Sequence, residues 1–357
     1  MARDQTLLGD IGGTTARFAV LTDDILGPID HLPVSGHRSM IDAIDAYLRS
    51  RRDGNRIGAA VLGVAGPVEN GRCIIINSQW VIDAAELRAA FGFKSINLIN
   101  DFEAIAYALP HLSAHDVRSL TGGKASSGES MVVIGPGTGL GMAGLISREG
   151  DTTIIATEGG HATLPGTTPR EDAVIAHLRR QFGHASAERA LSGPGLENLH
   201  AAIAAIDNVP VSSLTAAEIS RRALDRSCPI CAAAIDMFCA MLGTVAGDLA
   251  LTFRARGGVY ISGGIAPRLV DHLAQSDFRA RFVAKGRFRT YLESIPIAVI
   301  VDPDAAFLGL RSLAERRPSD DRASRTNHRD GFAHHDAACV RPCYRAAECA
   351  PNRVTQL

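Results

Sequence analysis

The sequence has no excess of positively or negatively charged residues, and it has no long apolar run. Its 37 Lys and Arg residues nearly equal its 38 Asp and Glu residues, and the formal net charge is -1. This balance gives no electrostatic reason to bind nucleic acid or an anionic membrane surface. The most apolar stretch, 232–251, is interrupted by Asp236 and Asp248, so it falls short of the roughly 18 apolar residues of a membrane span. We therefore expect neither nucleic acid nor a membrane as a partner.

Signals for export and for disulfide formation are also missing. Residues 1–6 are polar, and the apolar stretch after them is broken by Gly9 and Asp10, which is unlike a signal peptide. The seven cysteines show no spacing typical of a disulfide framework, as expected in a reducing compartment. We therefore expect a cytoplasmic protein.

The pair Cys228 and Cys231 has the spacing of redox and metal-binding motifs. A four-ligand zinc site needs two further donors, and no second cysteine pair lies nearby in the sequence. Cys239 continues a helical pattern. We assign no function to this pair from the sequence.

The length and composition are those of a globular protein with two domains: 357 residues, of which 46% are hydrophobic and 21% charged. Short apolar stretches typical of strands alternate with helical patterns. The expected strands span 6–8, 17–22, 57–64, 73–76, 96–99, 131–134, 142–146, 258–262 and 297–301. The expected helices span 40–50, 83–91, 102–109, 268–275 and 305–315, and helical patterns dominate 171–253.

A strand–turn–strand unit occurs near the N-terminus and again at 131–146. The repetition suggests two related α/β halves. The match is one of pattern and not of residues, so an unrelated pair of units remains the alternative. From Pro318 onward the apolar periodicity stops, and Arg, Asp, Ser, Ala and His dominate. Residues 318–357 are therefore expected to form a disordered tail.

The first glycine-rich segment lies between two expected strands and reads Gly9-Asp10-Ile11-Gly12-Gly13-Thr14-Thr15. Dinucleotide-binding and Walker loops lie between a strand and a helix, so a phosphate here would instead lie against a β-hairpin turn. Bare glycine backbone lets N–H groups approach phosphate oxygens closely, and the Thr14 hydroxyl can add a donor. An ordinary tight hairpin is the alternative.

Asp10 lies at the end of the first expected strand. Its negative charge would repel phosphate, so it is not expected to bind phosphate directly. A carboxylate can instead hold Mg²⁺, and it would do so through water because this ion keeps much of its hydration shell. The sequence thus indicates Asp10 as a magnesium-binding residue.

Two further glycine turns favour nucleotide binding over isolated hairpins. The segment 135–141 places Gly137, Thr138 and Gly139 between two expected strands, as a second phosphate clamp requires. Gly263 and Gly264 follow a strand and precede a helix, where bare backbone would let an adenosine lie flat.

With these motifs in place, the sequence resembles the bacterial glucokinases of the hexokinase, actin and Hsp70 superfamily, outside the ROK group. The resemblance runs from Leu7 to Leu313 and depends on the order and spacing of several motifs. They are Gly9-Asp10-Ile11-Gly12-Gly13-Thr14, Asn100-Asp101, Gly137-Thr138-Gly139-Leu140-Gly141, Glu158-Gly159-Gly160-His161, 187–195 and 257–268. The sequence departs from the family at Thr15, where Asn is common, and in 318–357, which has no counterpart.

The resemblance implies a two-lobed actin-like ATPase fold, similar to ribonuclease H. A smaller α/β domain would comprise 1–110 plus 303–317, a larger α+β domain 111–302, and the active-site cleft would lie between them. It implies ATP-dependent phosphorylation of D-glucose at the 6-hydroxyl, with Mg²⁺, giving glucose 6-phosphate and ADP and feeding glycolysis. Family analogy suggests a homodimer, with 232–251 as one candidate contact surface. The cysteine-rich zinc motif of ROK kinases is absent, so no zinc is expected.

The resemblance also places glucose on Asn100, Asp101, Glu158, His161 and Glu188. Asp101 follows an expected strand, where open α/β sheets place their ligand crevices, and it would be the general base for the sugar hydroxyl. The carboxylates of Glu158 and Glu188 can each accept from two adjacent hydroxyls. The alternatives are a helix cap for Asp101, a solvated charge for Glu188 and a core or capping role for His161.

Three other functions stay open. The same carboxylates serve many polyols, so the chain could be a kinase for another hexose. A sugar-sensing regulator would bind glucose and nucleotide without turnover, but the phosphate loop starts within ten residues of Met1, which leaves no room for an N-terminal helix-turn-helix. An actin- or Hsp70-like ATPase would have no use for the sugar-binding residues.

Overall fold

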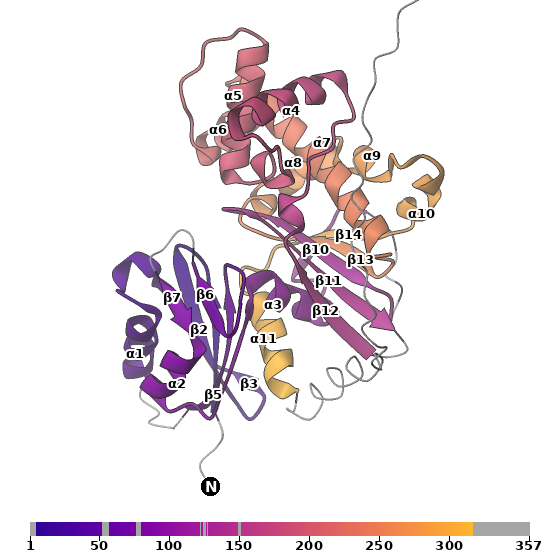
Figure 1. Cartoon of the computed structure of the whole chain (residues 1–357). Helices are drawn as coiled ribbons and strands as arrows, with labels where there is room; N and C mark the ends of the chain where they lie inside the picture. The colour runs from indigo at the N-terminus through magenta and orange to yellow at the C-terminus, as the bar shows by residue number, and fades with distance from the viewer. Residues whose placement is uncertain are drawn as a thin grey trace, which may run out of the picture. The chain divides into compact units, whose positions relative to one another are not determined.

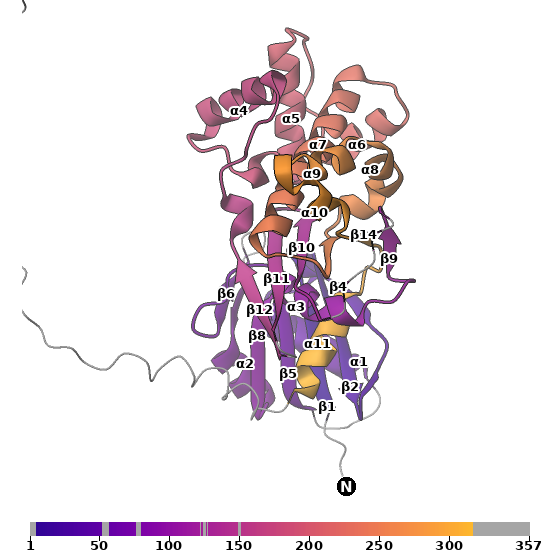
Figure 2. The ribbon, with the colours of Figure 1, turned by 90° about the vertical axis from the view of Figure 1, so that its right-hand side faces the viewer.

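The computed structural model describes residues 5–51, 57–75, 80–121, 123, 126, 128–148 and 151–316. Over these residues the chain forms two six-stranded sheets, a two-stranded ribbon and the helices that cover them (Figures 1 and 2). The ribbon consists of β6 (Arg72–Ile74) and β7 (Val81–Asp83). The expected α/β class is confirmed. The expected tail, 318–357, lies outside the described residues.

The first sheet is built on an N-terminal hairpin. Its strands are β1 (Gln5–Ile11), β2 (Thr15–Thr22), β3 (Ile25–Leu26), β4 (Asp30–Pro33), β5 (Ile57–Val64) and β8 (Ser95–Asn100). β1 pairs antiparallel with β2 and parallel with β5, and β5 pairs parallel with β8. The order is β3-β2-β1-β5-β8, and β4 also pairs with β2.

Helices cover both faces of this sheet. They are α1 (Met40–Ser50), α2 (Ala84–Phe91), α3 (Asp101–Ala108) and α11 (Ala306–Glu315). Side chains alternate along a strand, so Leu7 and Phe18 pack in the core with α1 and α2, whereas Leu8 and Ala19 pack with α3 and α11. The last helix of the described chain therefore completes the first sheet, beside α3 (Figure 1).

The second sheet repeats the strand order of the first. Its strands are β9 (Val117–Ser119), β10 (Met131–Pro136), β11 (Leu140–Arg148), β12 (Asp151–Thr157), β13 (Gly258–Ile261) and β14 (Ile297–Ile300). β10 pairs antiparallel with β11 and parallel with β13, which pairs parallel with β14. The order is β12-β11-β10-β13-β14-β9. A hairpin followed by two parallel strands in both sheets supports the two related halves that the sequence suggested.

Helices also make up the core beside the second sheet. They are α4 (Pro169–Phe182), α5 (Gly193–Ile206), α6 (Ala216–Leu224), α7 (Pro229–Thr252), α8 (Val270–Gln275), α9 (Phe278–Val283) and α10 (Arg289–Glu293). Single 3-10 turns occur at Val34–Gly36, Leu109–His111, Gly159–His161, Ala187–Arg189, Ala266–Leu269 and Gly286–Phe288.

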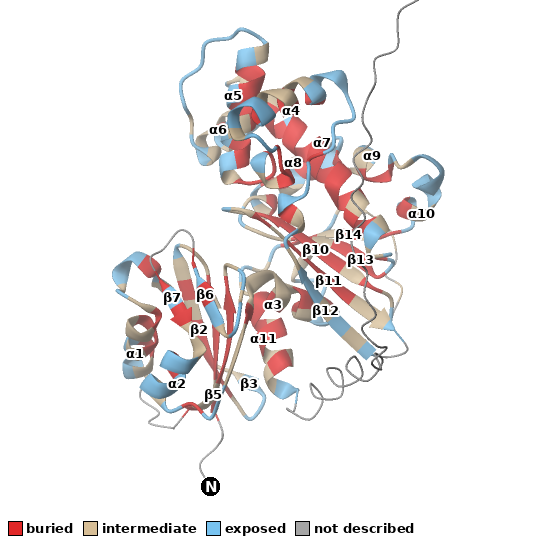
Figure 3. Ribbon diagram, in the orientation of Figure 1, coloured by how far each residue is buried: buried red, intermediate tan, exposed pale blue. Residues whose placement is uncertain are grey.

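α7 is the central helix of this core (Figure 3). By length and composition alone it could cross a membrane, with a mean hydropathy of 1.8, but 72% of the relevant window is buried inside the protein. It packs against α5, α6 and α9. The expectation that 232–251 forms a contact surface between subunits was wrong, because these residues are largely buried within the chain itself.

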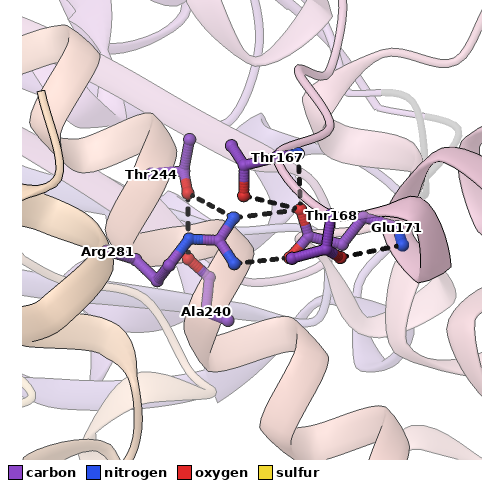
Figure 4. A network of polar contacts seen from close by, with 6 residues as sticks. All are labelled: Thr167, Thr168, Glu171, Ala240, Thr244 and Arg281. Atoms are coloured by element: carbon purple, nitrogen blue, oxygen red, sulfur yellow. Dashed lines mark hydrogen bonds and ion pairs between the residues drawn. The ribbon is translucent and has the colours of Figure 1, made fainter.

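A buried ion pair joins α4 to α7 and α9 (Figure 4). Glu171 is 3% exposed and accepts hydrogen bonds from Arg281 at 2.7 and 2.9 Å. Arg281 also donates to the Thr244 hydroxyl at 3.0 Å, and the Thr167 N–H donates to Glu171 at 2.8 Å. Burial alone would raise the pKa of Glu171, but the bonds from Arg281 and Thr167 lower it. The carboxylate is therefore ionised and fully paired at neutral pH.

The first glycine turn is shorter than the sequence suggested. β1 continues to Ile11 and β2 begins at Thr15, so only residues 12–14 form the turn. Glycine is needed within the strand at Gly9, because a Cβ there would lie 2.8 Å from Leu62.

Most expected strands and helices are present within a residue or two of their expected ends. The strands β3, β4, β7, β9 and β12 and the short helices α9 and α10 were missed. β12 has no buried position, and its sequence DTTIIAT carries no continuous apolar pattern. The division into 1–110 plus 303–317 and 111–302 stays a prediction, since the described residues up to Glu315 form one compact unit.

Candidate functional site

Asp101 is the first residue of α3, directly after β8. The preceding residue, Asn100, is the N-cap: its Oδ1 accepts from the N–H groups of Phe102 at 2.9 Å and Glu103 at 3.3 Å. Its Nδ2 donates to the Gly66 carbonyl at 3.1 Å. Asp101 Oδ1 also accepts from the Phe102 N–H, at 2.9 Å. Because Asn100 satisfies the helix start, capping alone does not account for a carboxylate at Asp101.

Asp101 and Asp10 interact across a bare glycine. In the parallel register Asp10 is paired with Gly63, and a Cβ on Gly63 would lie 3.7 Å from the Asp101 Cα. Because Gly63 has no side chain, nothing from that position separates the carboxylates of Asp10 and Asp101. Burial, and then the negative charge of Asp10, raise the pKa of Asp101 to about 7. Such a carboxylate is a suitable proton acceptor near neutral pH.

Arg17 pairs with Asp10 from the facing strand. The two residues are opposite in register, and Nη1 of Arg17 donates to Asp10 Oδ2 at 2.9 Å and to the Pro303 carbonyl at 2.7 Å. The Asp10 side chain is 14% exposed. Burial raises the pKa of Asp10, Arg17 lowers it and Asp304 raises it, with a raised pKa as the result. Asp304 Oδ1 is buried without a hydrogen bond among the described residues, with His31 Nε2 at 3.6 Å.

Asp10 is electrostatically coupled to both Asp101 and Asp304, but the three carboxylates are not among the described groups whose ligand atoms all lie within 4.8 Å of one another. Carboxylate oxygens are ligands that Mg²⁺ prefers, and the Oδ1 of Asp304, which accepts no hydrogen bond among the described residues, is a candidate contact for a water molecule bound to the ion. Electrostatic coupling of Asp10 to both Asp101 and Asp304 indicates that the three groups share one region. The sequence identified only Asp10 as a metal-binding residue, and Arg17 already holds one oxygen of that carboxylate.

Phe102 connects this region to the second hairpin. A Cβ added to Gly135 or to Gly141 would collide with the Phe102 ring, so the ring lies against the bare backbone of both residues. The two glycines are register partners in β10 and β11, and α3 contacts both strands. The helix that begins with Asp101 is thus docked on the hairpin that carries the second glycine turn.

Each hairpin turn has an exposed threonine at its tip, Thr14 in the first and Thr138 in the second. In the first turn the Gly12 N–H donates to the Thr15 carbonyl at 3.0 Å, and the Val34 N–H donates to the Thr14 carbonyl at 2.9 Å. The turn is therefore tied to the 3-10 turn at Val34–Gly36.

The second and third glycine turns lie side by side. The Gly137 N–H donates to the Gly139 carbonyl at 2.8 Å, which closes the second turn. Gly263 has φ +86°, and a Cβ there would collide with the Pro136 backbone. Gly264 follows in an exposed position, with no atom within 4 Å of an added Cβ. The bare backbone that the sequence indicated for an adenosine is present next to the second turn.

Glu188 is held against the second turn. Its Oε2 accepts a hydrogen bond from the Leu140 N–H at 2.9 Å, and a Cβ on Gly139 would lie 2.6 Å from the same oxygen. The Gly193 N–H, at the start of α5, donates to the Gly137 carbonyl at 2.8 Å. Glu188 is therefore bonded to the turn, which argues against the alternative of a solvated charge.

Glu158 and His161 lie at the two ends of a 3-10 turn beside Glu188. Their side chains are 69% and 61% exposed, and Oε2 and Nε2 are 3.8 Å apart. The Ala187 N–H donates to the Ala162 carbonyl at 2.8 Å, which joins this segment to the one that carries Glu188. His161 is exposed, so it is not a core histidine.

The sequence missed four residues that shape the site: Arg17, Gly63, Phe102 and Asp304. Arg17 could have been found, because it faces Asp10 once the hairpin is in register. Gly63 lies within a strand pattern, and the contacts of Phe102 and Asp304 join segments far apart in the sequence. No local pattern points to them.

The comparisons with known proteins agree with one another. The glucokinase family model matches residues 7–317. The glucokinase of Aromatoleum aromaticum is 47% identical over 305 residues, which cover 85% of this chain and 92% of that protein. Among solved structures, a glucokinase from an Antarctic psychrotroph has a TM-score of 0.79 and 34% identity, and covers 87% of this chain and 98% of that one. The glucokinase of Balamuthia mandrillaris in complex with glucose, at 22% identity and a TM-score of 0.71 over 88% and 94% of the two chains, supports the fold alone.

Proposed function

The chain belongs to the glucokinase family, and from this premise we propose that Asp101 is the general base in its transfer of the γ-phosphoryl group of ATP to the 6-hydroxyl of D-glucose. The products are glucose 6-phosphate and ADP. The observation that carries the proposal is the environment of Asp101, whose pKa is raised to about 7 by burial and by Asp10. A free aspartate, with a pKa of about 3.9, is a weaker base at neutral pH.

The position of Asp101 suits the proton transfer. The hydrogen bond from the Phe102 N–H to Oδ1 orients the carboxylate, so one oxygen is held while the group accepts the proton from the attacking hydroxyl. The deprotonated form is substantially populated at neutral pH because the pKa lies near 7. General base catalysis of this kind contributes about 10²–10⁴-fold.

ATP is proposed to lie against the three glycine turns. The contacting residues would be Gly9, Asp10, Ile11, Gly12, Gly13 and Thr14 in the first hairpin, Gly137, Thr138 and Gly139 in the second, and Gly263 and Gly264. The exposed Thr14 and Thr138 hydroxyls supply donors at the tips. Asp10, with Asp304 as a further candidate, would hold Mg²⁺ through water. This ion supplies charge neutralisation on the phosphates.

Glucose is proposed to bind Asn100, Asp101, Glu158, His161 and Glu188. Glu158 and His161 are exposed and 3.8 Å apart, and Glu188 is oriented by the Leu140 N–H. Asn100 uses Oδ1 and one Nδ2 hydrogen bond for the fold, and an NH₂ group has a second donor.

The test is a coupled assay of ADP release with purified full-length protein, run over a panel of hexoses with and without Mg²⁺. We expect glucose to be the preferred substrate and turnover to require Mg²⁺. Asp101→Asn should lower kcat at least about a hundredfold while the circular dichroism spectrum is unchanged. Asp45→Asn, on the exposed side of α1, is the matched control and should keep normal turnover. Near-normal kcat in Asp101→Asn would rule out its role as base.

The same preparation tests the oligomeric state. We propose a homodimer in the cytoplasm, on the analogy with the family. Light scattering coupled to size exclusion measures the mass directly, and a mass of a single 37.7 kDa chain at micromolar concentration would contradict the dimer.

A further inference from the structure

A second cluster of ligand-type side chains lies at the junction of α5 and α7. Cys228 is the N-cap of α7 and Cys231 lies in its first turn, while His200 projects from α5. One ring nitrogen of His200 and the two Sγ atoms lie within 4.8 Å of one another, the single group of this kind found among the described residues. None of the three belongs to the site proposed for glucose or ATP.

The histidine is buried without satisfying its polar atoms. His200 is 2% exposed, and its Nε2 has no hydrogen-bond partner among the described residues. Leaving a buried polar atom unpaired is unfavourable, so the lack of a partner from the described chain points to a bound ligand at this nitrogen. A neutral imidazole nitrogen without a hydrogen bond is free to bind a metal ion.

The donor chemistry selects a soft metal ion. Two thiols and an imidazole are typical zinc ligands, and around one tetrahedral zinc two sulfurs are separated by about 3.8 Å. The three ligand atoms lie within 4.8 Å of one another, so small side-chain movements would bring the two sulfurs to the separation found around zinc. Cys231 is buried and Cys228 half-buried, so the cluster has one side toward solvent where water could complete the coordination.

Helix capping by Cys228 and the nearby charge of Arg222 must both be compatible with a bound metal ion. The Cys231 N–H donates to Cys228 Sγ at 3.3 Å, so Cys228 also caps its helix, but capping does not involve His200. Arg222 lies near enough to affect all three groups. Its charge is offset in part by Glu218, 4.0 Å away, and by two thiolates when metal is bound.

We propose that His200, Cys228 and Cys231 bind one zinc ion that ties α5 to the start of α7. Binding releases the two thiol protons to solvent and needs no redox step. This reverses the expectation that the cysteine pair has no function and that the chain holds no zinc. His200 lies on a different helix from the two cysteines, so no local spacing in the sequence connects it to them.

Cobalt(II) is the probe, because thiolate ligands give it charge-transfer absorption that imidazole and carboxylate ligands do not. The parent protein is the full chain with Cys339, Cys343 and Cys349 replaced by serine, metal-depleted and kept under a non-thiol reductant. We expect one equivalent of Co²⁺ to give the thiolate band and one equivalent of Zn²⁺ to abolish it. Zn²⁺ should also raise the melting temperature.

Three variants and one control assign the ligands. Cys228→Ser, Cys231→Ser and His200→Gln should each weaken Co²⁺ binding at least about tenfold, whereas Cys239→Ser, also buried in α7, should bind as the parent does. Glucose phosphorylation and circular dichroism report whether each variant is folded. The absence of a thiolate band in the parent overturns the proposal even if a variant fails to fold. Unchanged binding in folded Cys228→Ser also overturns it.

Discussion

At the scale of single residues, Asp101 owes its basicity to its neighbours. A carboxylate at the start of a helix would ordinarily be more acidic than usual, because the helix dipole and the first N–H groups favour its charge. Here burial and Asp10 outweigh the bonds from Phe102 and Asn100, and the pKa rises. The absence of a side chain at Gly63 is part of the cause, since it leaves Asp10 and Asp101 on either side of bare backbone.

The coupling predicts a pH effect with a definite sign. Asp10→Asn removes a negative charge that raises the pKa of Asp101, so that pKa should fall below its wild-type value of about 7. The acid limb of the kcat profile, where Asp101 becomes protonated, should then move to lower pH, even if kcat itself falls. Steady-state kinetics from pH 5 to 9 measure this. Asp45→Asn is the control, and an acid limb that stays in place in Asp10→Asn would contradict the coupling.

The contact of Phe102 with two glycines makes a second prediction at this scale. Gly141→Ala places a Cβ against the ring, and overpacking of this kind costs about 1–3 kcal/mol. Urea unfolding followed by tryptophan fluorescence or circular dichroism gives the free energy. Gly58→Ala is the matched control, because a Cβ at Gly58 meets nothing within 4 Å. Equal stability of the two variants would show that the ring is not confined.

At the scale of secondary-structure elements, the Glu171–Arg281 pair fixes α4 against α7 and α9 (Figure 4). Arg281→Met should destabilise the fold by about 3–5 kcal/mol, because it leaves the buried carboxylate without its cation. Arg289→Ala, which breaks the exposed Arg289–Glu293 pair, should cost at most about 1 kcal/mol. Urea midpoints compare the two, and similar losses would contradict the role of burial.

The same pair gives a pH dependence. The pKa of Glu171 is lowered in the fold, so its ionisation stabilises the protein above the unfolded pKa of about 4.3. That stability is lost as pH falls through the lower, folded value. The difference in stability between wild type and Arg281→Met should therefore shrink in acid. A difference that is constant from pH 7 to pH 3 would exclude this account.

At the scale of the whole molecule, the chain closes on itself where α11 packs on α3 and the first sheet. A Cβ on Gly309 would collide with the Ala104 carbonyl, so Gly309→Val should separate α11 from α3 and cost about 1–3 kcal/mol or more. Arg311→Ala on the same helix removes only an exposed pair with Glu315 and should be nearly neutral. Thermal unfolding monitored by circular dichroism distinguishes them, and a neutral Gly309→Val would contradict the close packing.

Local patterns were sufficient for much of the fold. Apolar runs located β5 and α1 to the residue, and glycine flanked by strands identified both hairpins. The candidate site was predictable where its residues follow strands or turns, as Asp10 and Asp101 do. It was not predictable where it depends on contacts between distant segments, because the packing of Phe102 on Gly141, of Arg17 on Pro303 and of His200 on Cys231 leaves no local trace.

The hydrogen bond between Glu188 and the Leu140 amide has one further consequence. If glucose binds Glu188 and phosphate binds this turn, as proposed, a sugar hydroxyl and a turn amide donate to the same carboxylate, so occupancy by one ligand would alter the binding free energy of the other. Thermodynamic reciprocity then demands that nucleotide change the affinity for sugar by the same factor by which sugar changes the affinity for nucleotide. The hydrogen bond of the Leu140 amide would thus make the binding isotherm of the sugar depend on the concentration of nucleotide, and the reverse.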